Sequence, residues 1–207
     1  MHRQPYLNNP LLRLSYSLIA PIYDLVIERA MRTARRQSLR ALPADAGKQV
    51  LLSGVGTGLD FPLLPAHHHY TAVDFNPAML KRAQSRSGNL QLDFVLGDSM
   101  ALPFHDAQFD HVVLHLIVAV VPEPQRCLSE AARVLKPGGN IVLFDKFLQP
   151  GKAAPLRRLL TPLSRRIATR MDVVFEEVLN TAPELTVVSD LPLLANGWFR
   201  GIVLRKR

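Results

Sequence analysis

Three glycines at alternate positions, Gly54, Gly56 and Gly58, are the residues of this chain best suited to holding a ligand. They follow the apolar run Val50–Leu52, which predicts a buried strand. Glycine adopts positive φ and has no Cβ, so the chain can turn sharply and let a ligand lie against its backbone. Asp74 ends the next apolar run, eighteen residues after Gly56, close to the spacing of about 20 residues at which an acid takes a ribose hydroxyl. The pattern predicts a nucleotide pocket.

Histidines are the other side chains with evident chemistry. His115 follows the apolar run Phe109–Leu114. It is either a base that works near neutral pH or a hydrogen-bonded residue at the end of a buried strand. His67, His68 and His69 are adjacent, so their side chains point in different directions, and no partner acid or cysteine is apparent. We therefore expect no metal site.

The elements that must position these residues alternate between strands and helices. Apolar runs predict strands over residues 50–52, 70–74, 92–96, 109–114, 140–144, 185–191 and 199–205. Helices are predicted over residues 11–41, from residue 77, over 124–135 and over 173–179, with a sharp turn at residues 136–139. This alternation indicates a doubly wound, Rossmann-like α/β fold. We expect seven mostly parallel strands, an antiparallel terminal strand and helices on both faces, with the ligand at the carboxyl ends of the first strands.

The length of 207 residues fits one domain with appendages. We expect residues 43–207 to form that domain, with a basic helical insertion at about 151–180, and residues 1–42 to form basic amphipathic helices that cap the site. The net charge of +8 is concentrated, because residues 1–42 carry +5 and residues 151–170 carry +6. These segments are either solvated helix faces or a surface for anionic lipid or nucleic acid. No run approaches the roughly 18 apolar residues of a membrane-spanning helix.

Five motifs, in order along residues 50–144, carry a family resemblance. They are LLSGVGTG, AVDFNPAMLKRA, VLGDSMALPF, FDHVVLHLIVAVVPEP and ARVLKPGGNIVLF. On these motifs the chain resembles the class I S-adenosylmethionine-dependent methyltransferases, and it is most similar to the ubiquinone/menaquinone methyltransferases and the bacterial phospholipid N-methyltransferases. The stretch Ala20–Asp24 also resembles the start of that group. The resemblance implies an enzyme whose cofactor is S-adenosylmethionine (SAM).

The resemblance also implies roles for single residues. Asp74 would accept hydrogen bonds from the ribose hydroxyls, with Phe75 beside the adenine, and Asp98 would accept one from the adenine amino group. His115 would sit where the methyl donor meets the acceptor and Tyr23 would cap the pocket, which makes these two the candidate catalytic residues. The implied cofactor-binding residues are Ser53, Gly54, Gly56, Thr57, Gly58, Asp74, Phe75, Asp98, Ser99, Met100 and His115.

One position departs from the family pattern. Ser53 stands where the family usually has Glu or Asp, an acid that commonly fixes the amino end of the cofactor. A serine hydroxyl can accept a hydrogen bond but carries no charge. The departure keeps open a protein of another class, a SAM-binding regulator without transferase activity.

Chemistry and charge bear on the methyl acceptor. A neutral amine needs no strong base, whereas a carbon or phenol acceptor needs a base poised near neutral pH, and His115 is the obvious candidate. Residues 11–41 combine apolar spacing with arginine, as in a helix at an anionic membrane surface, and residues 152–170 are a second such contact. We therefore expect N-methylation of an amine headgroup such as phosphatidylethanolamine. The alternative is C- or O-methylation of a quinone precursor or another small molecule.

These expectations also suggest a location and exclude one class of partner. We expect a cytoplasmic protein, with peripheral attachment to the inner face of the membrane as an open alternative. We expect no nucleic-acid partner, because no nucleic-acid motif and no basic patch interleaved with aromatic residues accompanies the charge. The sequence leaves the oligomeric state open.

Overall fold

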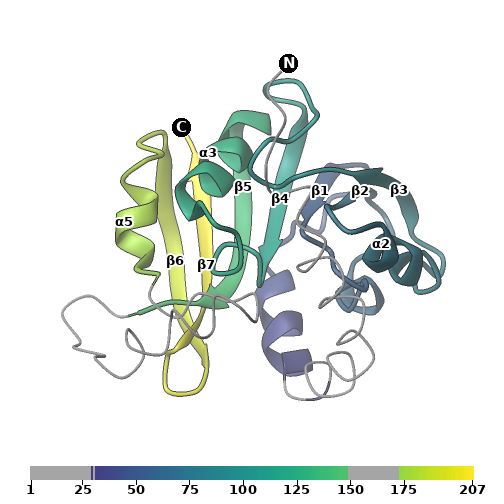
Figure 1. The fold of residues 1–207 in the computed structure, drawn as a ribbon, viewed down its shortest axis with the longest axis horizontal. Helices are drawn as coiled ribbons and strands as arrows, with labels where there is room; N and C mark the ends of the chain where they lie inside the picture. The colour runs from purple at the N-terminus through teal and green to yellow at the C-terminus, as the bar shows by residue number, and fades with distance from the viewer. Residues whose placement is uncertain (1–28, 30, 149–172) are drawn as a thin grey trace.

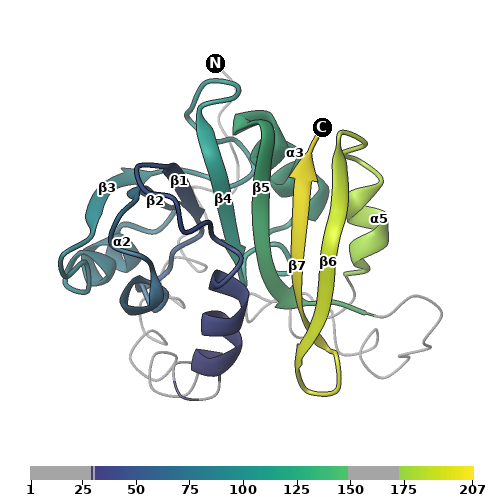
Figure 2. The ribbon, with the colours of Figure 1, turned by 180° about the vertical axis from the view of Figure 1, so that it is seen from behind.

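A computed structural model describes residues 29, 31–148 and 173–207. Its centre is a seven-stranded sheet in the order β3-β2-β1-β4-β5-β7-β6 (Figures 1 and 2). The strands are β1 (Gln49–Ser53), β2 (His69–Asp74), β3 (Gln91–Leu96), β4 (Phe109–His115), β5 (Leu135–Lys146), β6 (Leu185–Leu194) and β7 (Phe199–Lys206). Neighbours among β1 to β5 are parallel, and β7 runs antiparallel to both β5 and β6. The predicted fold class is confirmed.

The parallel register brings the predicted site residues to one edge of the sheet. Ser53 at the end of β1 is aligned with Val73 of β2 on one side and with Leu114 of β4 on the other. Asp74 and His115 each follow one of those partners directly, so they flank the end of β1. Spacing along the chain cannot show that these residues meet, because strand order decides it.

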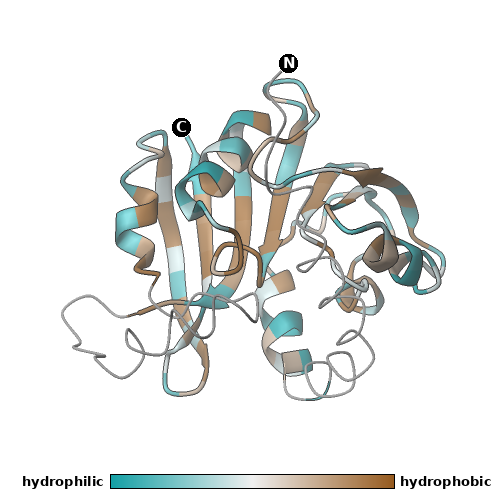
Figure 3. Ribbon diagram, viewed as in Figure 1, coloured by the Kyte–Doolittle hydropathy of each residue, from teal (hydrophilic) through white to brown (hydrophobic). Residues whose placement is uncertain are grey.

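Side chains that alternate along the strands feed two separate cores, one on each face of the sheet. Leu51, Val112 and Leu143 pack in the core that contains α3 (Pro124–Val134) and α5 (Phe175–Leu179). The alternate residues of the same strands pack in a second core, whose strand and helix members include Val50, Leu52, Val113, Val142, Leu39, Phe61 and Ala83. This two-sided burial is why the central strands are almost wholly apolar (Figure 3).

The second face is covered by a helix over residues 31–39, the short 3-10 helix η1 (Phe61–Leu63) and α2 (Pro77–Gln84). Pro77 occupies the first turn of α2, where its missing N–H costs nothing, and the Asn76 side chain accepts a hydrogen bond from Ala78 N at 2.9 Å. Helix 31–39 lies near the carboxyl end of β4, on the side of the sheet that faces the viewer in Figure 2.

Helix 31–39 has a clear division between a buried and an exposed face. Met31 and Ala34 pack with Phe144 and Phe199, the first at the carboxyl end of β5 and the second at the start of β7. Exposed arginines occupy the other face, at positions 29, 32, 36 and 40. Apolar contacts therefore seat this helix against the ends of the strands, and its charge faces solvent.

Two stretches differ in detail from the sequence prediction. Residues 136–139, expected as a turn before the fifth strand, are a bulge inside β5, between the paired positions Phe109–Leu135 and His111–Asn140. Phe175 and Val178 of α5 fall in the last part of the expected basic insertion, yet both are buried in the first core. The part of that insertion over residues 151–172 lies outside the described residues, as does most of the expected cap over residues 1–42.

We predict that Gly139→Ala lowers the stability of the fold. A Cβ at Gly139 would lie 2.5 Å from the carbonyl oxygen of Asp110 and 2.7 Å from Leu135 Cδ1, so the bulge would have to shift. The expected loss is about 1–3 kcal/mol, the usual range for overpacking. Urea unfolding followed by circular dichroism measures it. Gly88→Ala is the control, because its Cβ would meet open space and only its positive φ adds strain. Equal midpoints for Gly139→Ala and the unmutated chain would contradict the packing argument.

Candidate functional site

The glycine loop leaves the end of β1 and reaches η1 through backbone conformations that favour glycine. Gly54, Gly56 and Gly58 all have positive φ, at 75°, 55° and 78°. The N–H groups of Gly54 and Val55 donate to the carbonyl oxygen of Val73, at 2.8 and 3.0 Å, which fastens the loop to the end of β2. A Cβ on Gly54 would lie 2.6 Å from the side chain of Ile117, whereas one on Gly56 would meet nothing within 4 Å. The backbone at Gly56 is therefore open to a ligand.

The loop after β4 packs against this glycine loop. Ile117 packs against Gly54, and the buried carboxylate of Asp145 accepts a hydrogen bond from Ala119 N at 2.9 Å. Burial raises the pKa of Asp145, and the charge of Lys146 together with hydrogen bonds from backbone N–H groups partly offsets that rise. Sequence reasoning missed this contact, since Asp145 and Ala119 come from different strand ends.

Asp74 is a buried carboxylate that binds the glycine loop. Its Oδ2 accepts a hydrogen bond from Gly56 N at 2.8 Å, and its Oδ1 accepts one from Asn76 N at 2.9 Å. Burial raises the pKa of Asp74 to about 6, although these hydrogen bonds act to lower it. Within the described part of the chain no cation is paired with this carboxylate. Each oxygen keeps acceptor capacity, so further donors would stabilise its charge.

A side-chain hydrogen bond connects Ser53, at the end of β1, with Ser99, in the loop after β3. Ser53 Oγ donates to Ser99 Oγ at 2.8 Å, and both side chains are buried. Asp98 turns the backbone beside them, because its Oδ1 accepts from Met100 N at 2.9 Å. Met100 is buried and Phe75 is partly exposed. Asp74 and Ser99 thus lie next to the glycine loop and the residue before it.

His115 has close partners that the sequence did not reveal. Its Nδ1 lies 3.0 Å from Asp60 Oδ1, and its Nε2 lies 3.1 Å from Ser38 Oγ. Arg35 Nη1 donates to the same Asp60 oxygen at 2.8 Å. Burial alone would raise the pKa of Asp60, but the charges of Arg35 and His115 outweigh it and hold this pKa below its ordinary range.

We call these four residues the Asp60 network: Arg35, Ser38, Asp60 and His115. Two signals in the sequence could have pointed to it. Asp60 follows Gly58 by two residues, and Arg35 falls among the apolar positions of its helix rather than on the polar stripe. A small pocket adjoins the network, and its lining includes Ser53, Gly54, Asp60 and His115.

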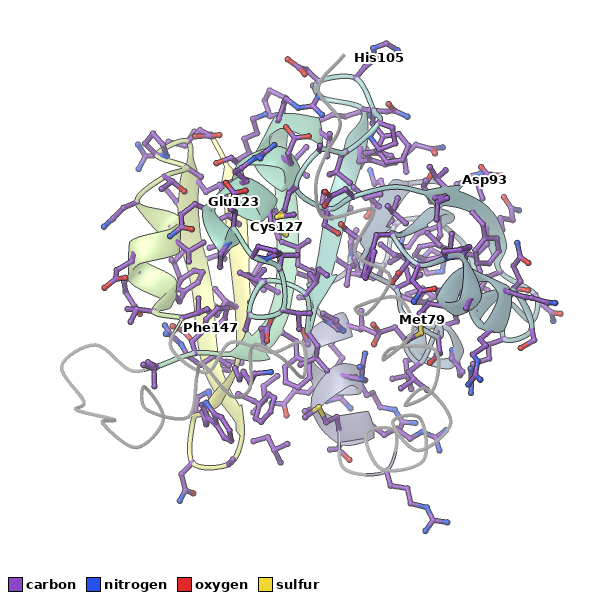
Figure 4. The ribbon with its side chains drawn as sticks, viewed as in Figure 1. Met79, Asp93, His105, Glu123, Cys127 and Phe147 are labelled. Carbon is purple, nitrogen blue, oxygen red and sulfur yellow. The ribbon has the colours of Figure 1, made fainter. Side chains whose placement is uncertain are left out.

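Several candidate residues lie outside the described residues, and one histidine lies away from the site. Tyr23 lies outside the described residues, as do residues 152–170. In the part of the chain that the structure describes, no group of three or more His, Cys, Asp or Glu residues could hold a metal ion. His105 lies at the opposite end of β4 from helix 31–39 (Figure 4).

Comparison with known proteins places this geometry in a family. A family model described as a methyltransferase domain matches residues 51–143. Phosphatidylethanolamine N-methyltransferase of Cereibacter sphaeroides is 34% identical over 191 residues, which cover 90% of this chain and 93% of that protein. The chain belongs to the S-adenosylmethionine-dependent methyltransferase family. It is therefore an enzyme that uses SAM as its methyl donor.

The chain is also similar to quinone methyltransferases. Demethylmenaquinone methyltransferase of Renibacterium salmoninarum is 37% identical over 132 residues, which cover 61% of this chain and 55% of that protein. The ubiquinone/menaquinone biosynthesis C-methyltransferase UbiE of a Ruegeria species is 32% identical over 163 residues, which cover 75% of this chain and 63% of that protein. Family membership alone therefore leaves the acceptor undecided.

Solved structures agree on the fold. A SAM-dependent methyltransferase of Thermotoga maritima has a TM-score of 0.69 at 20% identity, covering 94% of this chain and 99% of that one. The [4+2]-cyclase SpnF has a TM-score of 0.76 at 16% identity, covering 94% of each chain. Because a cyclase shares the fold, the reaction must be argued from the residues of the site.

Two observations indicate that the residues at the carboxyl ends of β1 and β2 fit SAM. The backbone at Gly56 has open space on the side where a Cβ would lie, so a ligand can approach it closely. Asp74 is a buried carboxylate without a cationic partner among the described residues, and it suits a further hydroxyl donor although backbone N–H groups already bind it. Ser53 offers only a hydroxyl, and that hydroxyl is already bonded to Ser99.

We predict that Asp74 makes the ligand-free protein less stable as pH rises from about 4 to 6. The native state holds the Asp74 proton up to a pKa of about 6, while the unfolded chain releases it near the ordinary aspartate pKa of 3.8. Proton release therefore favours unfolding in this window, by up to about 3 kcal/mol. Urea unfolding at pH 4 to 7 should show the unmutated chain losing stability relative to Asp74→Asn, in which this group does not titrate. Parallel curves for the two proteins would contradict the assignment.

Proposed function

We propose that this enzyme methylates the amine headgroup of phosphatidylethanolamine at an anionic membrane surface. The observation that carries the proposal is the nearly end-to-end match to phosphatidylethanolamine N-methyltransferase of Cereibacter sphaeroides, which covers 93% of that protein. The match to the Renibacterium salmoninarum quinone enzyme covers 55% of its length. Demethylmenaquinone methyltransferase of Beutenbergia cavernae also matches over 90% of this chain, at 32% identity, but over a smaller share of its own length, 82%. The share of the relative that is matched therefore favours the phospholipid enzyme.

In this proposal SAM lies across the carboxyl ends of β1 and β2 and the loop after β3. Asp74 accepts hydrogen bonds from the ribose hydroxyls with its spare lone pairs, and Phe75 borders the adenine. Asp98 accepts a bond from the adenine amino group, beside Ser99 and Met100. The methionine and ribose parts lie along Ser53, Gly54, Gly56, Thr57 and Gly58. Bound SAM supplies a methyl group on a sulfonium, whose leaving group is a neutral thioether.

The protein then has to place an acceptor beside that methyl group. An amine attacks with its own lone pair, so it needs alignment more than a strong base. In the structure both ring nitrogens of His115 lie within hydrogen-bonding distance of protein partners, Asp60 and Ser38. A histidine held in this way suits the shaping of a pocket wall, which is what an amine acceptor requires.

The exposed face of helix 31–39 fits a membrane surface. Arg29, Arg32, Arg36 and Arg40 are exposed at helical spacing. None of these four forms an ion pair with an acid in the described part of the chain. Each arginine near an anionic bilayer contributes about 1 kcal/mol of binding free energy. No helix among the described residues is long and apolar enough to span a membrane. We propose surface attachment through residues 11–41 and 152–170, with the transfer pocket close to the headgroups.

C-methylation of a quinone precursor is the second candidate, and one observation favours it. A carboxylate that orients a histidine, as Asp60 does with His115, is also how a general base is held, and a carbon acceptor needs such a base. Against it, Arg35 shares the Asp60 oxygen and Ser38 faces the other ring nitrogen.

We predict that SAM binds about tenfold more weakly at pH 5 than at pH 7, because only ionised Asp74 accepts both ribose hydroxyls and its pKa is about 6. Calorimetric titration at pH 5, 6 and 7 measures the dissociation constant. Asp74→Asn should bind SAM more weakly and lose this pH dependence. A dissociation constant that stays flat with pH in the unmutated protein would remove Asp74 from the ribose site.

A second prediction concerns the acceptor. Incubation with methyl-labelled SAM and vesicles of phosphatidylethanolamine and phosphatidylglycerol should place label in the amine headgroup, as read by mass spectrometry of extracted lipids. The double variant Arg32→Gln, Arg36→Gln should bind the vesicles about thirtyfold more weakly, which corresponds to two lost contacts of about 1 kcal/mol each.

Lys81→Gln is the matched control, since Lys81 is an exposed cation on α2, away from the arginine face. It should bind and methylate as the unmutated protein does. Label in a demethylated quinone, with none in the lipid headgroup, would establish the second candidate in place of the first.

A further inference from the structure

The Asp60 network joins three parts of the chain in a closed path. Arg35 and Ser38 lie three residues apart on helix 31–39, and both are buried. Arg35 reaches Asp60 directly, at 2.8 Å, while Ser38 reaches His115 at 3.1 Å. Asp60 and His115 then close the path at 3.0 Å. The helix is thus held at two points against the segment after the glycine loop and the end of β4.

Burial makes this network costly as a means of stability. The side chains of Arg35 and Asp60 are only 7% and 15% exposed. Removing two charges from water consumes most of what their attraction returns, so a buried ion pair adds little net stability. Helix 31–39 already has an apolar seat, where Met31 and Ala34 pack with Phe144 and Phe199. Seating the helix therefore does not explain a charged residue at position 35.

What the network does provide is a fixed orientation for His115. The ring has a hydrogen-bond partner at each nitrogen, and it packs edge-on against Phe144, with ring centroids 5.5 Å apart and planes at 76°. Asp60 and His115 also line the small pocket beside Ser53 and Gly54. The residues that fix the helix are therefore the residues that form one side of the pocket.

We propose that Asp60 is a positioning residue for the methyl acceptor, and that its carboxylate fixes His115 and helix 31–39 so that together they form the acceptor side of the transfer pocket. This inference rests on the proposed function, because it assigns the glycine-loop side of the pocket to SAM. It makes helix 31–39, with its arginine face, a part of the active site as well as a surface for lipid. Lipid bound along the arginines would then have its headgroup presented at that side of the pocket.

The test compares Asp60→Asn, Ser38→Ala, the double variant and the control Asp93→Asn. Asp93 is an exposed acid at the far edge of the sheet (Figure 4). Asp60→Asn should lower kcat/KM for phosphatidylethanolamine in vesicles by about tenfold to a hundredfold, the effect of a displaced reacting group. The dissociation constant for SAM should stay within about threefold. Asp60 binds Arg35 and His115, whereas Asp74 binds the backbone of Gly56 and Asn76, so the two carboxylates have no shared partner among these contacts.

The double variant gives the sharper readout. Asp60 and Ser38 are connected through His115, so removing both should cost no more than about the larger single effect, instead of the product of the two. Trypsin supplies a readout independent of turnover. Cleavage after Arg36 and Arg40, which are exposed on the docked helix, should be several-fold faster in Asp60→Asn than in Asp93→Asn.

Different outcomes separate this inference from the function on which it rests. No SAM binding and no methyl transfer by the unmutated protein would end the proposed function, while faster cleavage of Asp60→Asn would still support the network as the clamp on the helix. Single effects that multiply, or SAM affinity and acceptor kcat/KM that fall together, would overturn the positioning role. If Asp60→Asn does not fold by circular dichroism, Ser38→Ala alone carries the comparison, and unmutated values for it would overturn the proposal.

Discussion

The carboxylate of Asp74 holds the glycine loop in the shape on which the site depends. One of its oxygens accepts the N–H of Gly56 and the other accepts the N–H of Asn76, so a single buried group joins the end of β1 to the start of α2. Few groups at this position could do this, because two N–H donors from separate segments need an acceptor with two oxygens. Burial without a cationic partner raises the pKa of this acid. The same lack of a cation leaves its oxygens ready for hydroxyl donors of a ligand.

The two-sided packing of the sheet places that carboxylate where it can act. Because both faces of the central strands are covered, the strands are rigid and their carboxyl ends form a fixed edge. The strand ends and loops at this edge carry Gly56, Asp74, Asp98 and His115, which come from four different strands. Helix 31–39 meets the same edge from the second face, and the Asp60 network links it to the end of β4. In the proposed function, the cofactor side and the acceptor side of the pocket are thus built on one scaffold but from different residues.

The chemistry of methyl transfer explains why relatives with different acceptors share this scaffold. The donor carries its own leaving group, so the protein chiefly aligns two reactants and shields them. Such an enzyme can change its acceptor by changing the wall opposite the cofactor while the glycine loop stays the same. Similarity to both phospholipid and quinone methyltransferases is consistent with that division.

The sequence alone determined the strands, the glycine loop and the acid at the end of the second strand, because these follow from apolar runs and from the residues at their ends. It also indicated the fold class and the family. The structure buries Arg35 and leaves Arg32 and Arg36 exposed on the same helix. Only the tertiary structure decided that Arg35, Ser38, Asp60 and His115 meet, since these contacts join residues 25, 55 and 77 positions apart. Their meeting depends on where one helix packs against the strand ends, and local patterns of hydrophobicity carry no information about which polar side chains that packing will bury together.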